Sequence, residues 1–335
     1  MRNISLVILF FLSYSCTSMS QERRDSVINT SDSISCQKDS IITSRLTLLF
    51  AGDLMQHQAQ INAARTSTGY DYSDCFKFVK EEINRADIAI ANLEVTLGGK
   101  PYRGYPAFSA PDEYLFAIRD AGFDVLITAN NHCLDKGKKG LERTLLMLDS
   151  LQIPHAGTYV NTESREQQYP LLLEKNGFRI ALLNYTYGTN GIKVISPNVV
   201  NYIDKAVMAQ DIEAARAQHP DALIACMHWG DEYQSLPNKE QKNLTDWLLQ
   251  QGVTHIIGSH PHVVQPMELR TDSITGNQHV VVYSLGNFIS NMSARRTDGG
   301  LLFKLELEKD SVTRVANCGY SLVWTSRPVL SRKKK

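Results

Sequence analysis

The chain has 335 residues, of which 35 are lysine or arginine and 35 are aspartate or glutamate, so its formal net charge is zero. This balance removes any overall electrostatic attraction to nucleic acid or to an anionic membrane surface, and we expect no nucleic-acid partner. Apolar residues make up 43% of the chain, which is ordinary for a soluble globular protein. The length allows one large domain or a pair of small ones.

The N-terminus has the pattern of a secretory signal. A positive charge at Arg2 precedes an apolar run at residues 4–12. The run is too short to span a bilayer of about 30 Å, but it fits the hydrophobic region of a signal peptide. Ser15 and Cys16 then resemble a bacterial lipobox, although Ser13 stands where leucine is commoner. The alternative is ordinary cleavage near residue 20. We expect a secreted lipoprotein of the bacterial cell envelope, held to the membrane by a lipid anchor on Cys16.

Composition then divides the chain further. Residues 1–16 are the expected lipoprotein signal peptide, and residues 17–43, rich in Ser, Thr, Asp, Gln and Arg, indicate a flexible tether. Residues 44–327 are the expected domain, followed by a basic tail at 328–335. The six cysteines are scattered without a Cys-x-x-Cys pair, so a zinc knot is not expected. Cys226 lies in an apolar run and is expected in the core.

From residue 44 onward, short apolar runs alternate with amphipathic stretches, which is typical of a layered α/β fold. The expected strands are 46–51, 88–91, 125–129, 180–184, 223–227, 253–257 and 280–283. The expected helices are 74–85, 112–121, 137–150, 204–218 and 239–251. Near the C-terminus, residues 301–307 and 312–318 predict a β-hairpin at the sheet edge, without a following helix. Runs without polar alternation suit central strands that are covered on both faces.

Polar residues follow nearly every expected strand. In open α/β sheets, ligands bind beyond the carboxyl ends of the strands, so these residues are expected to face one crevice. They are Asp53, Glu94, Asn131, His132, Asp135, His228, His260, His262 and Asn287. Carboxylate, carboxamide and imidazole groups are the ligands that hard or borderline divalent metals use. The sequence therefore predicts a metal site at the strand ends.

Each of these residues alone has a simpler interpretation. Asp53 could cap a helix, and Asn130 with Asn131 could form an ordinary turn. A lone histidine after a strand is more often structural than a ligand. The conjunction favours a site, because four of the nine histidines of the chain lie beyond strand ends.

At these residues the sequence resembles the CapA-like proteins of poly-γ-glutamate capsule biosynthesis. The matching stretches occur in the order of the family and are residues 50–55, 91–94, 129–132, 184–191, 228–232, 258–265 and 283–288. The family is grouped with the calcineurin-like metallophosphoesterases. The resemblance therefore implies a four-layer α/β/β/α sandwich that is metallophosphoesterase-like.

The resemblance also implies roles for single residues. Asp53 and His262 resemble ligands of a first metal, and Glu94 stands near where a bridging aspartate would come. His228, His260 and Asn131 resemble ligands of a second metal. The implied cofactor is one or two divalent ions, which could be Mn, Fe, Zn or Mg.

This sequence departs from the superfamily pattern at positions that belong to the first metal. Met55 stands where the histidine of an Asp-x-His motif would be, and His57 comes two residues late. The second motif ends in Glu94 rather than in an aspartate. The first metal site is therefore short of a ligand relative to the superfamily pattern.

The remaining candidates concern the reaction. By resemblance, His132 is the catalytic histidine, which protonates a leaving group or stabilises the transition state, and Asp135 orients it. Candidates for substrate binding are Thr189, Asn190, Glu232 and Asn287. Thr189 and Asn190 could supply neutral donors to an anionic substrate, whereas Glu232 could be a ligand or a base.

These features support a first hypothesis and an alternative. The first is a metal-dependent hydrolase or transferase that acts on an envelope polymer or its phosphorylated intermediate. The alternative is a non-catalytic, membrane-anchored component for polymer synthesis or export, with a degenerate metal site. Other membrane proteins of capsule synthesis are the expected partners in either case.

The lipobox generates the first testable prediction. Cys16→Ser removes the thiol that would carry the lipid, so the variant should move from the membrane fraction to a soluble fraction. Cell fractionation followed by immunoblotting measures this distribution. A variant that stays as membrane-bound as the wild type would show that the lipoprotein prediction is wrong.

Overall fold

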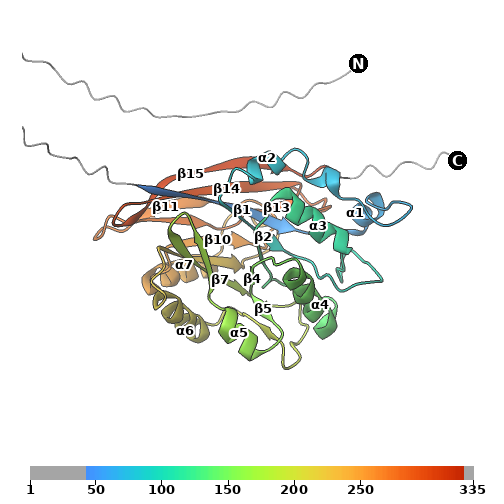
Figure 1. Ribbon diagram of the computed structural model, residues 1–335, viewed down its shortest axis with the longest axis horizontal. Coiled ribbons are helices and arrows are strands. Elements are labelled where there is room, and N and C mark those ends of the chain that lie inside the picture. Colours follow the sequence, from blue (N-terminus) through green and yellow to red (C-terminus); the bar gives the residue numbers. More distant parts are fainter. Residues whose placement is uncertain (1–42, 328–335) are drawn as a thin grey trace, which may run out of the picture. The chain divides into compact units, whose positions relative to one another are not determined.

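The computed structural model describes residues 43–327 (Figure 1). The expected signal peptide with Cys16, nearly all of the expected tether and the basic tail lie outside the described residues. No helix in the described part of the chain combines the length and the hydrophobicity that are needed to cross a membrane.

The first sheet, sheet 1, contains the N-terminal and C-terminal strands of the domain. Its strands are β1 (Ser44–Leu54), β2 (Ile88–Leu93), β3 (Val125–Ile127), β4 (His155–Ala156), β13 (Asn287–Ile289), β14 (Gly299–Lys309) and β15 (Thr313–Trp324). They lie in the order β15-β14-β1-β2-β3-β4, with β13 beside β1. The run from β1 to β4 is parallel, whereas β14 and β15 are antiparallel additions at the edge.

The second sheet, sheet 2, is built from the middle of the chain. Its strands are β6 (Leu171–Lys175), β7 (Phe178–Thr186), β9 (Ala222–His228), β10 (His255–Ser259), β11 (Met267–Thr271) and β12 (Gln278–Val282). They lie in the order β11-β12-β10-β9-β7-β6, and the central strands are parallel. A separate small ladder joins β5 (Thr158–Tyr159) to β8 (Val199–Val200).

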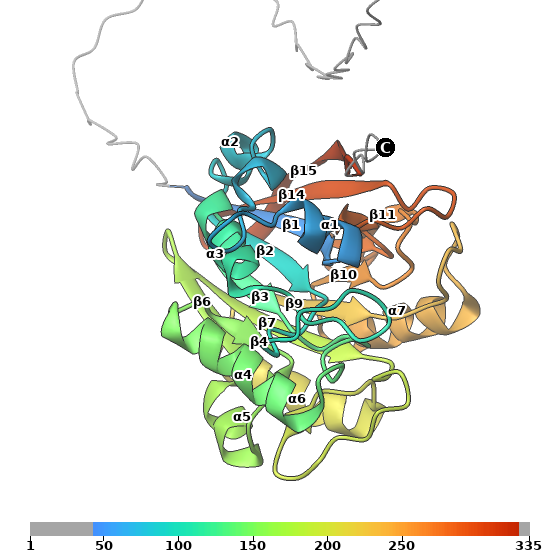
Figure 2. The same cartoon turned by 90° about the vertical axis from the view of Figure 1, so that its right-hand side faces the viewer.

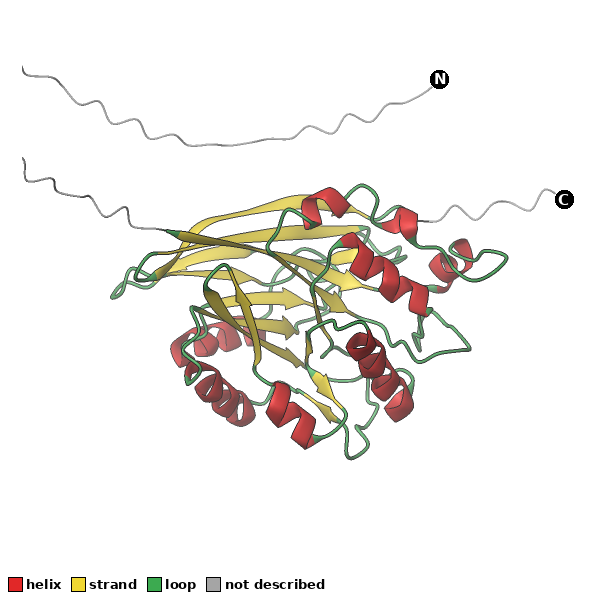
Figure 3. Cartoon of the chain, viewed as in Figure 1, coloured by secondary structure: helices red, strands yellow, loops and turns green. Residues whose placement is uncertain are grey.

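The helices lie between these strands in the chain. They are α1 (Gln58–Ala63), the 3-10 turn η1 (Ser73–Cys75), α2 (Lys80–Ile83), α3 (Asp112–Ala121), α4 (Gly137–Ser150), α5 (Thr162–Gln168), α6 (Lys205–Arg216) and α7 (Lys239–Gln251). Figure 3 shows the strands in yellow between groups of red helices.

The domain consists of four layers, because each sheet buries both of its faces. One core lies between the sheets and includes Phe50 of β1 and Cys226 of β9. A second packs the other face of sheet 1 against α3 and α4, through residues such as Leu115. A third packs sheet 2 against α6 and α7, through residues such as Ile212 and Leu248. The expected α/β/β/α sandwich is confirmed, and so is the core position of Cys226.

The sequence predicts several helices to the residue. Those expected at 112–121, 137–150 and 239–251 are α3, α4 and α7. The helix expected at 74–85 is instead a 3-10 turn followed by the single-turn helix α2. Aromatic and β-branched residues in this stretch favour helix only weakly, and Phe76 is fixed by ring contacts with Phe123 and Phe288. Tertiary packing therefore decides the local conformation there.

The expected C-terminal hairpin is also present. Strands β14 and β15 pair antiparallel from Gly299↔Trp324 to Lys309↔Thr313, and β15 lies at the edge of sheet 1. No helix follows β15 among the residues described. The hairpin extends sheet 1 and covers part of the core between the sheets.

A buried histidine outside the strand-end cluster makes stability depend on pH. His255 at the start of β10 is 3% exposed, and its Nδ1 accepts a hydrogen bond of 3.1 Å from the Val280 amide. Burial, and to a lesser degree the charge of His279, lowers the pKa of His255 from 6.5 to about 3. The folded chain therefore keeps this imidazole neutral.

We predict that the free energy of unfolding falls as the pH is lowered from 6.5 toward 3, because the unfolded chain binds this proton first. The loss attributable to His255 should approach about 1.4 kcal/mol per pH unit. His255→Asn keeps a hydrogen-bond acceptor but cannot titrate, so it should flatten this part of the curve. Urea denaturation between pH 7 and 4 measures the effect.

The matched control is His219→Asn. His219 is exposed and has a positive φ of 51°, a conformation that asparagine also adopts. This variant should keep the pH dependence of the wild type. The assignment to His255 fails if both variants give the same curve.

Candidate metal centre

The side chains expected at the metal site lie together where strands of both sheets end. Asp53 is near the end of β1, Glu94 directly follows β2, and His228 is the last residue of β9. His260 and His262 follow β10. In Figure 1, β1 runs from left to right, and Figure 2 turns that right-hand side toward the reader. The parallel strands therefore bring residues that are far apart in sequence to one end of the sandwich.

Asp53 and Glu94 are fully buried carboxylates that share one amide. Asn92 Nδ2 donates to Asp53 Oδ1 at 2.8 Å and to Glu94 Oε2 at 3.2 Å. Asn92 Oδ1 accepts from Asn130 Nδ2 at 3.1 Å, which ties the loop after β3 to the same group. The remaining carboxylate oxygen, Glu94 Oε1, is buried without a hydrogen-bond partner.

His228 lies between the two sheets. Its Nε2 is 2.9 Å from Asn131 Oδ1 and 3.8 Å from Glu94 Oε1. Its Nδ1 is 3.1 Å from Ser259 Oγ. Strands β9 and β10 pair His228 directly with Ser259, so sheet register places the hydroxyl beside the ring.

The loop after β10 presents two histidines in an unusual backbone conformation. His260 and His262 have φ values of 97° and 59°, a region that non-glycine residues seldom adopt. A Cβ atom on Gly258 would lie 2.0 Å from the Tyr283 carbonyl oxygen, so only glycine allows this approach. His260 Nδ1 is buried without a partner. Backbone strain of this kind concentrates at functional sites.

The pKa values of the carboxylates diverge. Burial raises the pKa of Glu94 well above its usual range, and the negative charge of Asp53 adds to this. Burial acts in the same direction on Asp53, but the hydrogen bond and charge of His262 outweigh it and lower the pKa. The environment therefore favours a proton on Glu94 and an anionic Asp53.

The pKa values of the three histidines in the cluster also shift in different directions. Burial, followed by the charges of neighbouring histidines, lowers the pKa of His228 well below its usual value and that of His260 to about 3. Burial also opposes the charge on His262, but its hydrogen bond and charge interaction with Asp53 outweigh burial and raise the pKa. His228 and His260 are therefore neutral imidazoles, the form that binds metals.

His132 and Asp135 form a buried pair beside this cluster. His132 Nδ1 is 2.8 Å from Asp135 Oδ2, and their side chains are 5% and 2% exposed. The Phe108 amide donates to the same carboxylate oxygen at 2.7 Å, and the Phe108 ring packs edge-on against the imidazole at 4.6 Å. The contact with the carboxylate thus fixes the orientation of the ring.

The two loop candidates for substrate binding, Thr189 and Asn190, differ in how their side chains are hydrogen-bonded. The Thr189 hydroxyl donates to the Ile192 carbonyl at 2.7 Å and bonds the Tyr202 hydroxyl at 2.9 Å. Asn190 is exposed, and its Oδ1 accepts from Asn131 Nδ2 at 3.3 Å. The Thr189 side chain therefore shapes its loop, whereas Asn190 lies next to the cluster.

The other two candidates differ in their exposure to solvent. Glu232 is exposed, and its charge raises the pKa of both Glu94 and His262. Asn287 is buried in β13, and its Oδ1 is 3.1 Å from His262 Nδ1. Glu232 is therefore open to solvent near the cluster, whereas Asn287 contacts a histidine inside it.

The residues that depart from the superfamily pattern have other roles. The Met55 side chain packs in the hydrophobic core between sheet 1 and its helices. His57 precedes α1, and its Nδ1 accepts a 3.2 Å hydrogen bond from the Asn291 amide. Neither residue is grouped with the possible metal ligands among the described residues.

Sequence reasoning gave no role to several residues that hold the cluster. Asn92 and Asn130 are polar residues at the ends of apolar strands, a signal that was available in the sequence. The position of Ser259 beside His228 depends on the register between β9 and β10. Tyr187 is 47% exposed and its ring lies 4.5 Å from that of His260, and no sequence signal identifies this contact.

The donor set fits a divalent cation. Two groups of metal-type side chains have ligand atoms within 4.8 Å of one another, and both include Glu94. One group adds His260 and His262, and the other adds Asp53 and His228. Glu94 Oε1 and His260 Nδ1 are buried atoms without partners, which is costly unless a ligand satisfies them.

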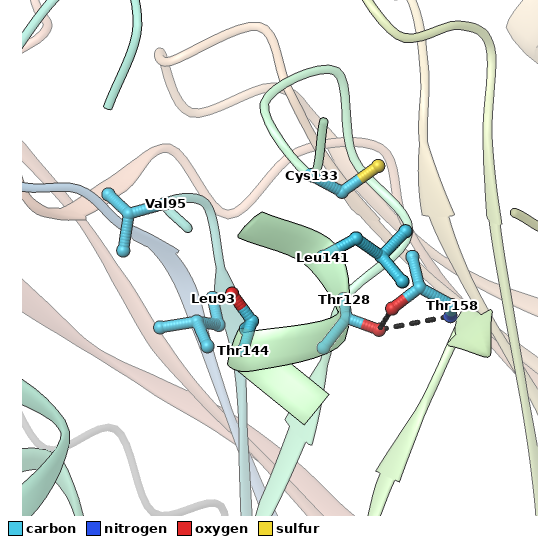
Figure 4. Close-up of a pocket in the computed structure, with 7 residues that line it drawn as sticks. All are labelled: Leu93, Val95, Thr128, Cys133, Leu141, Thr144 and Thr158. Carbon is cyan, nitrogen blue, oxygen red and sulfur yellow. Dashed lines mark hydrogen bonds between the residues drawn. The ribbon is translucent and has the colours of Figure 1, made fainter. Parts of the chain in front are cut away.

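One small cavity beside the cluster is too small for a substrate. A cavity of about 10 Å³ lies behind the loop after β3, between Leu93, Thr128 and Cys133 (Figure 4). The hydroxyls of Thr128 and Thr158 satisfy each other across it at 2.8 Å. Such a cavity has room for at most one water molecule, so it is a packing void.

The family of the chain can be established from its sequence. The profile of the family described as "Bacterial capsule synthesis protein PGA_cap" matches residues 47–292. The chain belongs to this family. The matched region begins in β1 and ends after β13, so it contains every strand end that carries the site. The CapA-like resemblance predicted from the motifs is confirmed.

Curated relatives match over most of the chain. "Capsule biosynthesis protein CapA" of Bacillus anthracis is 26% identical over 287 residues, covering 81% of this chain and 66% of that protein. "PGA biosynthesis protein CapA" of Bacillus subtilis (strain 168) is 29% identical over 279 residues, covering 80% and 70%. The chain thus spans about two thirds of the length of these relatives.

A solved structure is similar in fold. Haemophilus influenzae NAD nucleotidase (NadN) aligns with a TM-score of 0.52 at 12% sequence identity, over 84% of this chain and 57% of that one. At this identity the likeness concerns the fold alone. The metallophosphoesterase-like fold of this PGA_cap protein is therefore confirmed.

The two histidines that resemble ligands of a second metal, His228 and His260, generate the next prediction. His228→Ala and His260→Ala should each abolish metal retention, because losing a direct ligand costs more than the about 10–100-fold typical of an outer contact. Elemental analysis of the purified full-length protein, at fixed pH because protons compete for imidazole, measures the metal content.

His279→Ala serves as the control, because the ring of His279 bonds the Thr254 carbonyl oxygen, at the opposite end of β10 from His260. This control should retain the metal content of the wild type. Equal metal content in the wild type and in both ligand variants would mean that these histidines only form hydrogen bonds in a metal-free cleft.

Proposed function

We propose that this protein is a metal-dependent hydrolase or transferase of the bacterial envelope. It acts on a capsule or exopolymer of the poly-γ-glutamate type, or on a phosphorylated intermediate of that polymer. Membership of the capsule synthesis family supports the process. The observation that carries the chemistry is the pair of unpartnered buried atoms, Glu94 Oε1 and His260 Nδ1, beside the His132–Asp135 pair.

The residues that would hold the ion are drawn from both sheets. They are Asp53, Glu94, Asn131, His228, His260 and His262. A divalent cation bound there would lower the pKa of water from 15.7 to about 7 and polarise a phosphoryl or carbonyl oxygen. Imidazole and carboxylate ligands suit Zn, Fe or Mn better than Mg, which prefers oxygen ligands.

His132 is the group that moves a proton. Asp135 Oδ2 holds the Nδ1 atom of His132. The other ring nitrogen, Nε2, can therefore donate a proton to a leaving group or take one up as a base. Asp135 is itself held by a hydrogen bond from the Phe108 amide, which orients the carboxylate. The Phe108 ring excludes water from one side of the imidazole. The pair therefore has the geometry of an oriented general acid.

The departures at Met55 and Glu94 favour one alternative, a membrane-anchored component that binds or guides the polymer without cleaving it. In this alternative the cluster has a structural role. Both functions place the protein in the envelope, attached through Cys16 and working with other membrane proteins of capsule synthesis. The proposals differ in whether His132 is needed.

The test is an activity screen of the purified full-length protein in detergent. Bis-p-nitrophenyl phosphate, p-nitrophenyl phosphate and poly-γ-glutamate oligomers serve as probes of phosphodiester, phosphomonoester and amide cleavage. We expect one activity that a chelator abolishes and a divalent metal restores. His132→Gln should lower kcat by about 10²–10⁴-fold, the usual contribution of a positioned acid or base, and Asp135→Asn should lower it by less.

The control is again His279→Ala, which should keep the full rate. A rate that survives the chelator, or that His132→Gln leaves unchanged, would refute the hydrolase proposal. Full capsule assembly in cells that carry only the His132→Gln protein would favour the non-catalytic component.

A further inference from the structure

The edge strand β15 exposes three large side chains that are mainly apolar. Tyr320, Leu322 and Trp324 are 57%, 78% and 70% exposed. Alternate residues of a strand point to the same face of the sheet, so these side chains form one row, the β15 strip. Single exposed apolar residues are ordinary on a protein surface, whereas contiguous ones can mark an interaction site. The β15 strip is therefore a candidate docking surface.

The strip is an uncovered part of the face that sheet 1 turns toward sheet 2. Across β14 and β15, Tyr320 pairs with Phe303 and Leu322 pairs with Leu301. Paired residues share a face of the sheet, and Phe303 and Leu301 are buried in the core between the sheets. β15 is the last strand of sheet 1, and no described strand pairs with its outer edge (Figure 1). The inner face of sheet 1 thus extends beyond the cover that sheet 2 provides.

Three arginines lie next to the end of the strip. Trp324 pairs with Gly299, so the loop that leads into β14 lies beside the end of β15. This loop carries Arg295 and Arg296, and Arg327 follows β15; all three are exposed. The ion pairs found within residues 43–327 include none of these arginines. Their charges are therefore available to a partner.

The sequence around the strip is poor in opposing charge. Asp298 is the only acidic residue between positions 287 and 305, and residues 311–335 contain none. Glu82 contacts Ser321, which lies on the other face of β15. Residues 332–335, which are outside the described part of the chain, add four cations further along the sequence. Positive charge therefore accumulates near this end of β15, although the net charge of the whole chain is zero.

Aromatic rings beside unpaired cations suit the surface of an anionic bilayer. Tryptophan and tyrosine concentrate at the boundary between lipid and water, because each combines an apolar ring with a polar group. Arginine and lysine next to a membrane are attracted to anionic headgroups. A second copy of the chain would match the apolar strip but not the arginines, because its own strip has so few acidic neighbours. An anionic lipid surface matches both.

We propose that the β15 strip, together with Arg295, Arg296 and Arg327, docks the domain onto a bilayer that contains anionic phospholipids. The rings enter the headgroup boundary, and the arginines contact phosphate groups. This surface is separate from the metal ligands, so the inference goes beyond the function proposed above. Docking of this kind is reversible and does not by itself hold a protein on a membrane. It is therefore compatible with the release expected for Cys16→Ser.

Docking would also orient the metal centre. Gly300 at the start of β14 forms a bridge to Gly286, and the next residue, Asn287, lies 3.1 Å from His262. The end of β15 and the strand ends that carry the cluster therefore lie at the same end of the sandwich. A docked domain would hold the cluster close to the bilayer, within reach of substrates at its surface.

The first test uses Trp324 as the probe. The purified full-length protein is reconstituted in vesicles of phosphatidylcholine, alone or in an equimolar mixture with phosphatidylglycerol. Brominated acyl chains quench any tryptophan that reaches them. The other two tryptophans are Trp229, which is 2% exposed, and the partly buried Trp247. Trp324→Phe gives their signal alone, so the difference from the wild type reports Trp324. We expect quenching of Trp324 in the mixed vesicles that high salt reverses, and little quenching in phosphatidylcholine.

The second test removes the cations. Arg295→Gln combined with Arg296→Gln should lower the ratio of docked to undocked protein by about 5-fold for each arginine, because a cation near an anionic surface contributes about 1 kcal/mol. The matched control is Lys239→Gln combined with Lys242→Gln, since both lysines are exposed on α7, which covers the outer face of sheet 2. This control should dock like the wild type. Thermal denaturation shows whether each variant is folded.

The proposal fails if Trp324 is unquenched in the mixed vesicles, or equally quenched in both kinds of vesicle. It also fails if the folded double arginine variant docks like the wild type. Iodide in the absence of vesicles tests the other occupants, and we expect it to quench Trp324 freely. Shielding from iodide in a dimer, detected by sedimentation equilibrium, would assign the strip to a second copy. Shielding in a monomer would assign it to the chain's own residues 328–335. None of these measurements depends on catalysis.

Discussion

The constraint on which the site depends is the burial of two carboxylates side by side. Asp53 and Glu94 are both 0% exposed and end neighbouring strands of one sheet. Buried charges cost several kcal/mol each unless partners compensate them. Asp53 is compensated by His262, and Asn92 donates to both carboxylates. Glu94 retains one oxygen without a partner, and the neighbouring histidines surround that atom.

Strand geometry creates this arrangement. The pairing of β1 with β2 is regular up to Ala51↔Ala91 and then shifts, so that Asp53 pairs with Asn92. The extra residue is Gly52, where a Cβ atom would lie 1.9 Å from the Gly286 carbonyl oxygen. Bulges of this kind re-aim side chains next to active sites. Here the irregularity sets Asp53 against Asn92 and, in the parallel pair with β13, against Asn287.

Much of this could be predicted from the sequence, for a physical reason. Parallel strands deliver their carboxyl ends to one edge, so apolar runs ending in Asp53, His228 or His260 predict a shared crevice. The sequence could not show how single atoms are used. Asp53 and Asn287 both contact His262 Nδ1, and Asn287, which is distant in the chain, comes close only through β13. The turn at 73–76 was missed for a related reason, because ring contacts of Phe76 override local preference.

The family assignment and the site geometry carry different kinds of information. Membership of the PGA_cap family fixes the fold and the process in which relatives take part. Family membership does not determine the reaction, which depends on the side chains of the site, because one fold can host many functions. Met55 and Glu94 are the positions where this chain differs from the superfamily pattern.

The division of the cluster between two sheets has a mechanical consequence. Glu94 follows a strand of sheet 1, whereas His228 and His260 follow strands of sheet 2. An ion bound to Glu94 and to either histidine would cross-link the layers and would bind only while the layers are packed together. Ligand present at 100 times its dissociation constant stabilises a folded state by about 2.7 kcal/mol. The supply of cation would then set how stable the folded domain is, as well as whether its site is complete.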